Sequence, residues 1–531
     1  MLRACLAKRD QWWFAFYEER EKPIVPTLAE LIANGRGVEG HRPCPRVLVN
    51  EDLWCLLAAQ FAEGRATLLG LWGDVAAVHM AILGEDQKQI AVASIECPDR
   101  RFPSIGRVHP PAIRLERAAR DLFGLDPVGL PDERPWLDHG RWNLHHPLAK
   151  EPQPHGDRHP YAFLSVEGES LHQIAVGPVH AGIIEPGHFR FTANGETVVR
   201  LEERLGYTHK GIESLMSGAS VDHAARLASR TSGDSTVAYA FALARAVEAA
   251  LAIEIPPRAI WLRALMAELE RLANHLGDIG AICNDAGFAL MLAHCGVLRE
   301  RVLRTAQTCF GHRLMMDCIV PGGVGADLPA RGFDQIRELV GTIGRAFPPL
   351  VELYDNTASL QDRTVGTGLA RPALVKQYGC GGYIGRASAR AFDTRVQLSY
   401  PPYEAMFFNY DVPVLAEGDV NARLWIRIRE VEQSLALIEQ ILARMPVGDA
   451  LRVPVTGTGD TVEGLALVEG FRGDILVWVR LDGYARVERC HLRDPSWFQW
   501  PVLEAAIENN IVADFPLCNK SFNCSYSGHD L

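Results

Sequence analysis

The feature that most constrains the fold is a run of long helical patterns between residues 237 and 354. In the second of these segments, leucines recur every three or four positions, which places them on one face of an α-helix: Leu262, Leu265, Leu269, Leu272 and Leu276. A face this apolar has to be covered, so we assign these leucines to the core. The pattern predicts a long helical bundle.

The boundaries of four helices follow from the residues that flank them. The first is predicted from Val237 to about Ile253, because the sequence EIPP follows and a residue before proline avoids the helical region. The second is predicted from Arg258 to Leu276, with Gly277 as its C-cap. The third covers Phe288 to about Phe310, and the fourth lies near Phe333 to Tyr354.

The first 140 residues or so follow another pattern, in which short apolar runs alternate with turn signals: RVLVN, ATLLGLW, VAAVHMAIL and QIAVASIE. Such runs are typical of strands. A chain of 531 residues is also too long for one ordinary core. We therefore predict an α+β N-terminal domain (1–143), a linker rich in proline and histidine (144–160), and a mainly α-helical domain with peripheral strands (161–531). Two of those strands flank a turn at Arg472, Gly473 and Asp474.

Composition excludes several classes of protein. A net charge of -11 argues against a nucleic-acid partner. The start of the chain reaches charged residues before any long apolar stretch forms, so we expect no signal peptide. The longest uncharged run, Ala286 to Leu298, is shorter than the roughly 18 to 20 residues that span a bilayer. We expect a cytoplasmic protein that reaches a membrane only through partners.

Twelve cysteines are present, and no two of them form a Cys-x-x-Cys pair. Scattered single thiols in such a chain are usually small buried hydrophobic groups. Cys524 is the exception, because its neighbours carry one of the motifs described below.

Glu116 to Leu137, ERAARDLFGLDPVGLPDERPWL, is the sharpest motif of the N-terminal domain. It resembles the signature of the small hydrophilic subunit that docks beside the quinone-site subunit in respiratory complex I. The resemblance implies a docking surface that includes Arg117, Asp121 and Phe123. The residues alone also fit an ordinary helix end with Gly124 as its C-cap.

Two motifs early in the second domain carry acid–base residues. GPVHAGIIEPGHFRF, from Gly177 to Phe191, is predicted as strand-turn-strand with the bend at Pro186 and Gly187. LEERLGYTHKGIESLM follows and alternates acids with bases: Arg204, His209, Lys210 and Glu213. Solvated turn and helix residues would look similar.

These motifs resemble a family that joins the quinone-site subunit of complex I to the large subunit of nickel-iron hydrogenases. GYTHKGIE matches the GYxHKGxE element shared by both. By resemblance, His180 matches the histidine of the complex I hairpin, and Glu185 the proton-relaying glutamate of the hydrogenases. By the same resemblance, either His188 or no residue takes the role of contacting a quinone.

The metal-binding motifs of the hydrogenases are altered here. Those enzymes carry an Arg before Cys-Gly-x-Cys, because soft thiolates suit nickel and iron. This chain has Arg230, followed by Ser232, Gly233 and Ser235, and Gly233 stands where complex I supplies a tyrosine to the quinone.

The C-terminal half of the hydrogenase motif, Asp-Pro-Cys-x-x-Cys, is altered too. Cys524 fits its first cysteine and Ser527 its second. One thiolate in place of four predicts no nickel-iron centre and no metal ligands. The four positions at which the hydrogenases have cysteines are occupied here by Ser232, Ser235, Cys524 and Ser527, and these residues line the predicted cofactor site.

Asp393 and Arg395 belong to a further shared element, GYIGRASARAFDTR. They are predicted to form an ion pair that lines the buried centre, or one that is only structural.

The resemblance runs from about Glu116 to the end of the chain. It points to the large subunit of energy-converting, formate-hydrogenlyase type hydrogenases, in a cysteine-lacking branch, fused to the complex I small subunit. It implies an oxidoreductase subunit, NADH dehydrogenase-like, on the cytoplasmic side of the cell membrane. Its implied partners are a subunit carrying iron-sulfur clusters and membrane subunits of antiporter type.

Three functions stay open at this point. The emptied site could accept a quinone and couple electron transfer to ion translocation. The chain could instead be a non-catalytic scaffold between redox and membrane subunits. An active hydrogenase with an unusual site is the third.

Overall fold

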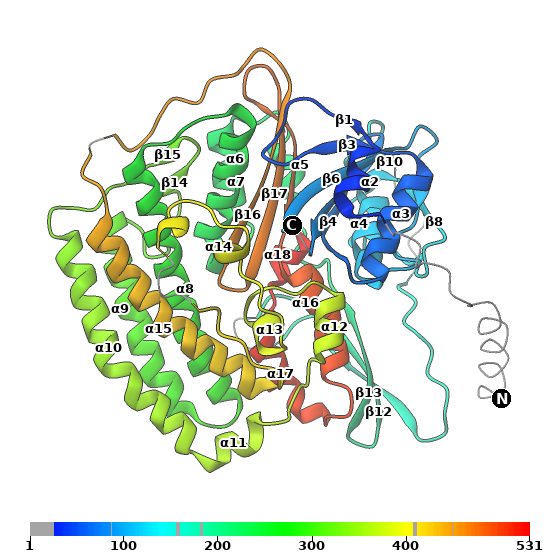
Figure 1. The fold of residues 1–531 in the computed structure, drawn as a ribbon. Helices are drawn as coiled ribbons and strands as arrows, with labels where there is room; N and C mark the ends of the chain where they lie inside the picture. The colour runs from blue at the N-terminus through cyan, green and yellow to red at the C-terminus, as the bar shows by residue number, and fades with distance from the viewer. Residues whose placement is uncertain (1–25, 86–87, 155–159, 181–183, 407–410, 449) are drawn as a thin grey trace, which may run out of the picture.

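The computed structural model describes residues 26–85, 88–154, 160–180, 184–406, 411–448 and 450–531. A sheet-containing N-terminal part is followed by long helices and a late group of strands (Figure 1). This confirms the predicted class, an α+β domain followed by a mainly α-helical domain with strands. No helix in the described ranges is long and apolar enough to cross a membrane.

The N-terminal domain is built on a five-stranded sheet in the order β1-β3-β6-β5-β4. Its strands are β1 (Arg36–Gly37), β3 (Arg46–Leu48), β4 (Ala66–Gly73), β5 (Ala77–Gly84) and β6 (Gln89–Glu96). The four apolar runs of the sequence coincide with β3 to β6, because the buried strand interior selects β-branched and aliphatic residues. The domain also contains α2 (Leu28–Ala33), α3 (Glu51–Ala62), α4 (Ile113–Phe123), β7 (Arg101–Pro103) and β8 (Asp126–Val128).

The four predicted long helices are present: α7 (Thr236–Leu251), α8 (Pro257–Asp285), α9 (Ala289–Phe310) and α10 (Gly332–Asn356). A fifth, α15 (Val420–Arg444), packs against α8. The prediction that Gly277 caps the second helix was wrong. Helix α8 continues to Asp285, and Gly277 lies within it facing the side chain of Arg299 on α9, so the glycine allows close packing.

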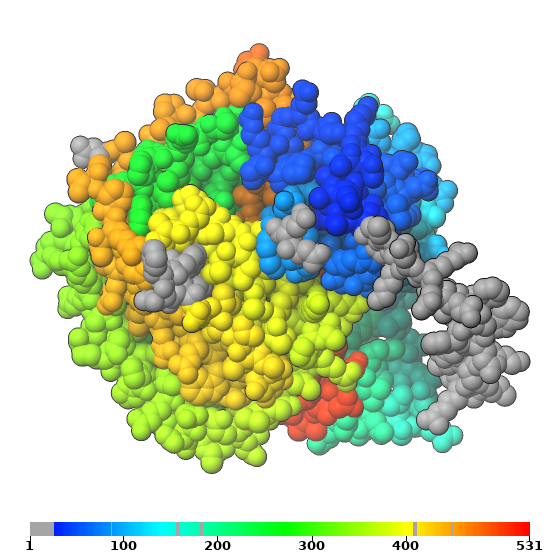
Figure 2. Space-filling view, viewed as in Figure 1, coloured from blue at the N-terminus to red at the C-terminus, as the bar shows by residue number. Residues whose placement is uncertain are grey.

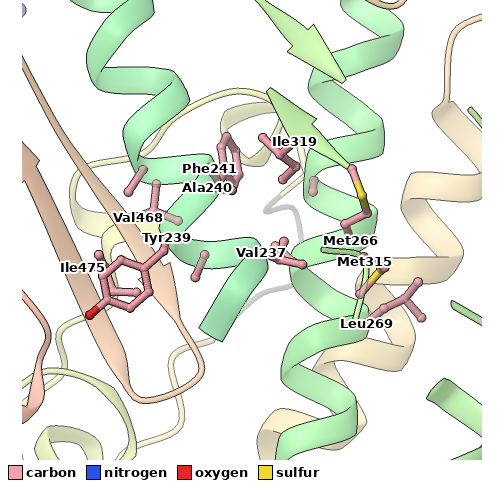
Figure 3. Close-up of a cluster of buried hydrophobic side chains, with 14 of the residues drawn as sticks. Val237, Tyr239, Ala240, Phe241, Met266, Leu269, Met315, Ile319, Val468 and Ile475 are labelled. Carbon is pink, nitrogen blue, oxygen red and sulfur yellow. The ribbon is translucent and has the colours of Figure 1, made fainter. Parts of the chain in front are cut away.

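Helix α7 forms the centre of the core. It packs against β16 (Val462–Gly470) and β17 (Gly473–Leu481) on one side and near α8 on the other. In Figure 3 Tyr239 lies beside Ile475, while Val237 faces Met266 and Leu269. An apolar helix enclosed by neighbours on all sides explains why its sequence lacks a polar stripe.

The two parts of the chain share a sheet, with strand order β18-β17-β16-β2. The short β2 (His41–Arg42) pairs in parallel with Glu463 and Gly464 of β16, and β18 (Val487–Arg493) forms the other edge. Arg46 of β3 also pairs with Glu463, at 2.8 Å. In the space-filling view the N-terminal residues meet the later ones along a continuous surface (Figure 2).

The segment predicted as a linker contains two short paired strands, β9 (Leu144–His145) and β10 (Gln153–Pro154). The backbone N–H of Leu148 donates to the carbonyl oxygen of Leu122, at 2.9 Å, so this part lies against α4. Residues 1–25 of the first domain and 155–159 of the linker lie outside the described residues. The division at 143 and 161 stays a prediction.

The other elements complete the second part of the chain. A three-stranded sheet contains β11 (Leu171–Val176), β12 (His188–Asn194) and β13 (Thr197–Arg204). The remaining strands and shorter helices are α5 (Ile212–Met216), α6 (Val221–Ala228), β14 (Ile319–Val320), β15 (Gly323–Val324), α11 (Ala358–Thr364), α12 (Pro372–Gln377), α13 (Gly382–Ala387), α14 (Thr394–Gln397), α16 (Ser496–Ala506), α17 (Phe515–Phe522) and α18 (Tyr526–Asp530).

The predicted docking surface is not on the surface of the chain. Arg117, Asp121 and Phe123 are buried. Arg117 donates to the carbonyl oxygen of Arg134 at 2.7 Å, and the Asp121 carboxylate accepts from the backbone N–H of Trp136 at 2.6 Å. These residues therefore hold the chain that leaves α4. Gly124 ends that helix with φ 68°, as its alternative role predicted.

Candidate functional site

The two altered metal motifs meet in the structure. Residues Ser232 to Ser235 form a short turn that leads into α7, which we call the serine turn. The segment between α17 and α18 lies beside it. The hydroxyl oxygens of Ser232 and Ser525 are 2.9 Å apart, and the Ser232 hydroxyl donates to Asp234 Oδ1 at 2.7 Å. The serine that contacts Ser232 is thus Ser525 rather than Ser527.

An arginine from a distant hairpin fills the centre of this site. Arg472 lies at the turn between β16 and β17, and its two Nη groups donate to the two oxygens of Asp234, with Nη1–Oδ1 at 2.8 Å. Nη1 also reaches the Ser235 hydroxyl at 3.3 Å, and Nε donates to the Asn523 carbonyl oxygen at 2.5 Å. Burial would raise the pKa of Asp234, but the guanidinium outweighs it and holds that pKa below its usual value.

Cys524 and Ser527 line the same region. Burial raises the pKa of the Cys524 thiol well above its usual value, so the thiol stays protonated. The backbone N–H of Ser527 donates to Glu185 Oε2 at 3.0 Å, which brings the predicted glutamate to the site. Three hydroxyls and one thiol do not fit a nickel-iron centre, which binds through four thiolates.

The GYTHKG segment connects the two motifs. The Lys210 ammonium donates to the carbonyl oxygens of Arg230 at 2.9 Å and Thr231 at 2.7 Å. His209 Nδ1 lies 2.7 Å from the carbonyl oxygen of Asp530. The segment thereby positions the serine turn against the C-terminal helix α18.

Three of the predicted catalytic residues point elsewhere. Arg204 donates to the carbonyl oxygen of Asp138 at 3.1 Å and lies over the ring of Tyr161. Glu213 pairs with Arg489 and His491, each at 2.8 Å. Arg230 forms an ion pair with Asp317, in which Nη2 lies 2.8 Å from Oδ2, on a partly exposed side of the turn.

His180 and His188 fix the connection between β11 and β12. His180 Nε2 lies 2.8 Å from the Gly187 carbonyl oxygen, and His188 Nδ1 lies 3.3 Å from that of Gly177. The connection is longer than predicted, since β11 ends at Val176 and β12 begins at His188. Residues 181–183 of it lie outside the described ranges.

Asp393 and Arg395 form the predicted ion pair, at 2.7 Å, within a larger buried cluster. Arg395 also reaches Glu268 of α8 at 2.9 Å. Nearby, Arg386 bridges Glu430 of α15 and Glu469 of β16, at 2.7 and 2.9 Å.

This cluster lies at the turn end of the hairpin that carries Arg472, because Glu469 pairs with Asp474 beside that turn. Burial, together with Asp393, raises the pKa of Glu469 to about 7. The cluster therefore packs against the hairpin through Glu469, and this carboxyl group titrates near neutral pH.

Sequence reasoning missed Asp234, Arg472 and Ser525 as members of the site. Asp234 and Arg472 are 238 positions apart, and no local pattern links residues at that separation. The sequence pattern around Arg472 predicts only a turn between two strands. Sequence reasoning also missed Glu270. Its carboxylate accepts a hydrogen bond from the backbone N–H of Val237 at 2.7 Å, where α7 begins. Burial raises the pKa of Glu270 to about 8.

A small cavity reaches the serine turn. It is lined by Gly233, Asp234, Glu270 and Asn274 among others and has a volume of about 20 Å³. That is room for about one water molecule. A quinone ring does not fit in it.

Comparison with known proteins identifies the family. A family model described as the 49 Kd subunit of respiratory-chain NADH dehydrogenase matches residues 285–458, and one described as the 30 Kd subunit matches residues 67–158. Hydrogenase-4 component G of Escherichia coli (strain K12) is 31% identical over 90% of this chain and 84% of its own length. The chain belongs to this family of NADH dehydrogenase and hydrogenase subunits.

Further relatives agree. Formate hydrogenlyase subunit 5 of the same organism is 31% identical over 81% of this chain and 77% of its own length. A solved structure described as the membrane-bound sulfane sulfur reductase, an archaeal respiratory membrane complex, contains a chain that superposes with a TM-score of 0.64 at 25% identity. It covers 68% of this chain and 99% of that one.

The predicted resemblance is thus confirmed, including the order of a 30 Kd-type part before a 49 Kd-type part. The relatives in this NADH dehydrogenase and hydrogenase family are subunits of oxidoreductases. In this family member the chemistry of the site depends on the serine turn and on Arg472.

Proposed function

We propose that the chain is the peripheral-arm subunit of a membrane-bound oxidoreductase that couples electron transfer to ion translocation. Its partners in this proposal are a subunit carrying iron-sulfur clusters and membrane subunits of antiporter type, with the assembly on the cytoplasmic side of the membrane. Membership of a family that includes hydrogenase and respiratory-complex subunits supports it.

The observation that carries the proposal is the Asp234–Arg472 ion pair between the two altered motifs. It sits among Ser232, Ser235 and Ser525, where thiolates would be needed for nickel and iron. We infer that the site has been rebuilt without metal and that the chain has no hydrogenase activity. A quinone or another small carrier is the proposed electron acceptor, bound where this chain meets its iron-sulfur partner.

A second candidate is a coupling subunit without a substrate of its own. The small volume of the cavity at the serine turn favours it, because a quinone ring needs far more than about 20 Å³. In that case the chain transmits changes in a neighbouring redox subunit to the membrane subunits.

Variants of Glu185 and His209 in the intact complex distinguish the two candidates. Glu185→Gln and His209→Gln are compared with Glu300→Gln, a change at an exposed ion pair on α9. Electron transfer from a reduced dye to a soluble quinone analogue is measured together with ion movement into vesicles. Assembly is checked by size-exclusion chromatography.

Loss of electron transfer in an assembled complex supports the quinone-reducing role. An unchanged redox rate with impaired ion movement supports the coupling subunit. The quinone-reducing role assumes that Glu185 and His209 carry protons for the coupling. Normal rates of both processes in both variants contradict that role for these residues.

A further inference from the structure

Two carboxylates share one arginine where α4 meets the second part of the chain. Arg114 of α4 lies 3.3 Å from Glu203 Oε2 of β13 and 2.6 Å from Glu504 Oε2 of α16. The backbone N–H of Glu203 donates to the other oxygen, Oε1, of Glu504 at 2.8 Å. None of these three residues was singled out by the sequence.

The charges in this junction do not balance if both glutamates are ionised. Glu202, next to the pair, is already neutralised by Arg134 at 2.5 Å, and Arg134 also binds Asp132. Arg117 lines the same cavity and pairs with Asp132 at 2.9 Å. Further titratable groups close to the junction are His529, whose pKa burial lowers, and Tyr378, Cys518, Cys524 and Tyr526. Each is neutral at physiological pH, so Arg114 faces two carboxyl groups.

One oxygen of the pair has no hydrogen-bond partner within the described part of the chain. Glu203 is 1% exposed, and its Oε1 is buried without a donor nearby. An ionised carboxylate in this setting is costly, and two carboxylates that share a site do not both ionise readily. Burial, followed by the charge of Glu504, raises the pKa of Glu203 well above its usual value.

The pair lies between solvent and the candidate site. On its outer side a cavity of about 210 Å³ is lined by Arg114, Glu203 and Glu504, and the Glu504 side chain is 20% exposed. On its inner side the charge of Glu203 acts on Cys524 and on Tyr526, which belong to the segment beside Ser232.

We propose that Glu203 and Glu504 form a proton-loading site, in which one proton enters from water through the cavity and is held at Glu203 Oε1. Deprotonation returns that proton to water or to the next acceptor, with no change in redox state. The geometry of the two glutamates is what holds the proton. Any use of this proton in ion coupling rests on the proposed function. The two glutamates titrate as a unit, so removal of either one changes the protonation of the other.

Infrared difference spectroscopy of the full-length protein at neutral pH tests this proposal, because protonated carboxyl groups absorb separately from carboxylates. Glu270 and Glu469 also contribute protonated carboxyl groups at this pH, so the comparison is the difference between each variant and the wild type. We expect Glu203→Gln to lose the equivalent of one protonated carboxyl group relative to the wild type. We expect Glu504→Gln to lose it as well, since Glu203 then faces Arg114 without a competing charge and ionises. Arg114→Met is expected to keep this protonated group up to higher pH, and Glu300→Gln is the control with no change.

A proton count gives an independent readout. Potentiometric titration is expected to show about one bound proton fewer per chain at neutral pH in Glu203→Gln than in the wild type. An unchanged protonated-carboxyl intensity in both glutamate variants relative to the wild type overturns the proposal. If Glu203→Gln does not fold, the partly exposed Glu504→Gln supplies the same comparison. These results do not depend on electron transfer, so the proposed function can fail while the proton site stands.

Discussion

Arg472 contacts two separate segments of the chain at once. Its guanidinium binds the carboxylate of Asp234, the hydroxyl of Ser235 and the carbonyl oxygen of Asn523. A buried arginine with these bonds stabilises the site only while Asp234 supplies the compensating charge.

Asp234→Asn is therefore expected to lower the free energy of unfolding by about 3 kcal/mol, because it leaves Arg472 buried without its counter-ion. Urea denaturation followed by circular dichroism measures the change. Asp334→Asn removes an exposed carboxylate 3.9 Å from Arg337 and is expected to have little effect. Equal effects of the two changes would contradict the importance of the Asp234 pair.

Glu213 provides a pH-dependent test. Burial opposes its ionisation, but Arg489 and His491 outweigh burial and lower its pKa to about 2. A lowered carboxyl pKa contributes stability above the unfolded pKa of about 4.5, and that contribution is lost as the pH falls towards 2. We expect Glu213→Gln to cost about 3 kcal/mol at pH 7, with the difference from wild type shrinking below about pH 4.5. A difference that is constant from pH 7 to 4 would be inconsistent with this assignment.

At the residue scale the sequence predicted part of the site. Ser232, Ser235, Cys524 and Glu185 were predicted from motif positions, and the fold brings them to one region. Arg472 could not be predicted from local pattern, because its role arises only when the hairpin folds against α7.

At the scale of elements, α8 and α9 pack unusually closely at Gly280. A Cβ built on this glycine would lie 3.0 Å from Leu292 Cα and 3.0 Å from Cys295 Cβ. The backbone of α9 cannot move away without loss of the surrounding contacts. The position explains why a residue with poor helix propensity occurs inside a long helix.

Gly280→Ala is expected to destabilise the protein by about 1–3 kcal/mol, since the overpacking outweighs the gain in helix propensity. Gly344→Ala in α10 is the matched control. A Cβ there meets nothing within 4 Å, so the same change is expected to stabilise by about 0.5–1 kcal/mol. Thermal unfolding of both variants measures the change in stability that each substitution causes. Stabilisation by Gly280→Ala would refute the close packing.

Elements were predicted more reliably than their ends. Apolar periodicity predicted α7 to α10, because it reports burial directly. It could not indicate that Gly277 continues a helix, since a capping glycine and a packing glycine look alike in sequence. Gly277 packs against α9, and the position of α9 cannot be seen from the sequence around Gly277.

At the scale of the whole molecule, β2 of the N-terminal domain extends the sheet of β16 to β18. Arg46 binds Glu463 and Arg480 binds Asp74, so charge pairs cross the same junction. No local sequence pattern indicates this connection, because Arg46 and Glu463 are 417 positions apart. Two domains were predicted from length and composition, but not the strand that they share.

The shared sheet predicts that the two parts unfold together. We expect differential scanning calorimetry to show one transition, with a calorimetric enthalpy equal to the van't Hoff enthalpy. Glu463→Gln is expected to lower the temperature of that transition. Two separate transitions in the wild-type protein would show that the parts are independent.

The central claim is that the serine turn and Arg472 form a site without nickel. Elemental analysis of the purified, fully assembled complex by plasma mass spectrometry tests it most directly. The donor chemistry predicts nickel far below one atom per copy of this chain, with iron accounted for by the clusters of the partner subunit. One nickel per copy, removed together with hydrogen-oxidising activity by chelation, would contradict it.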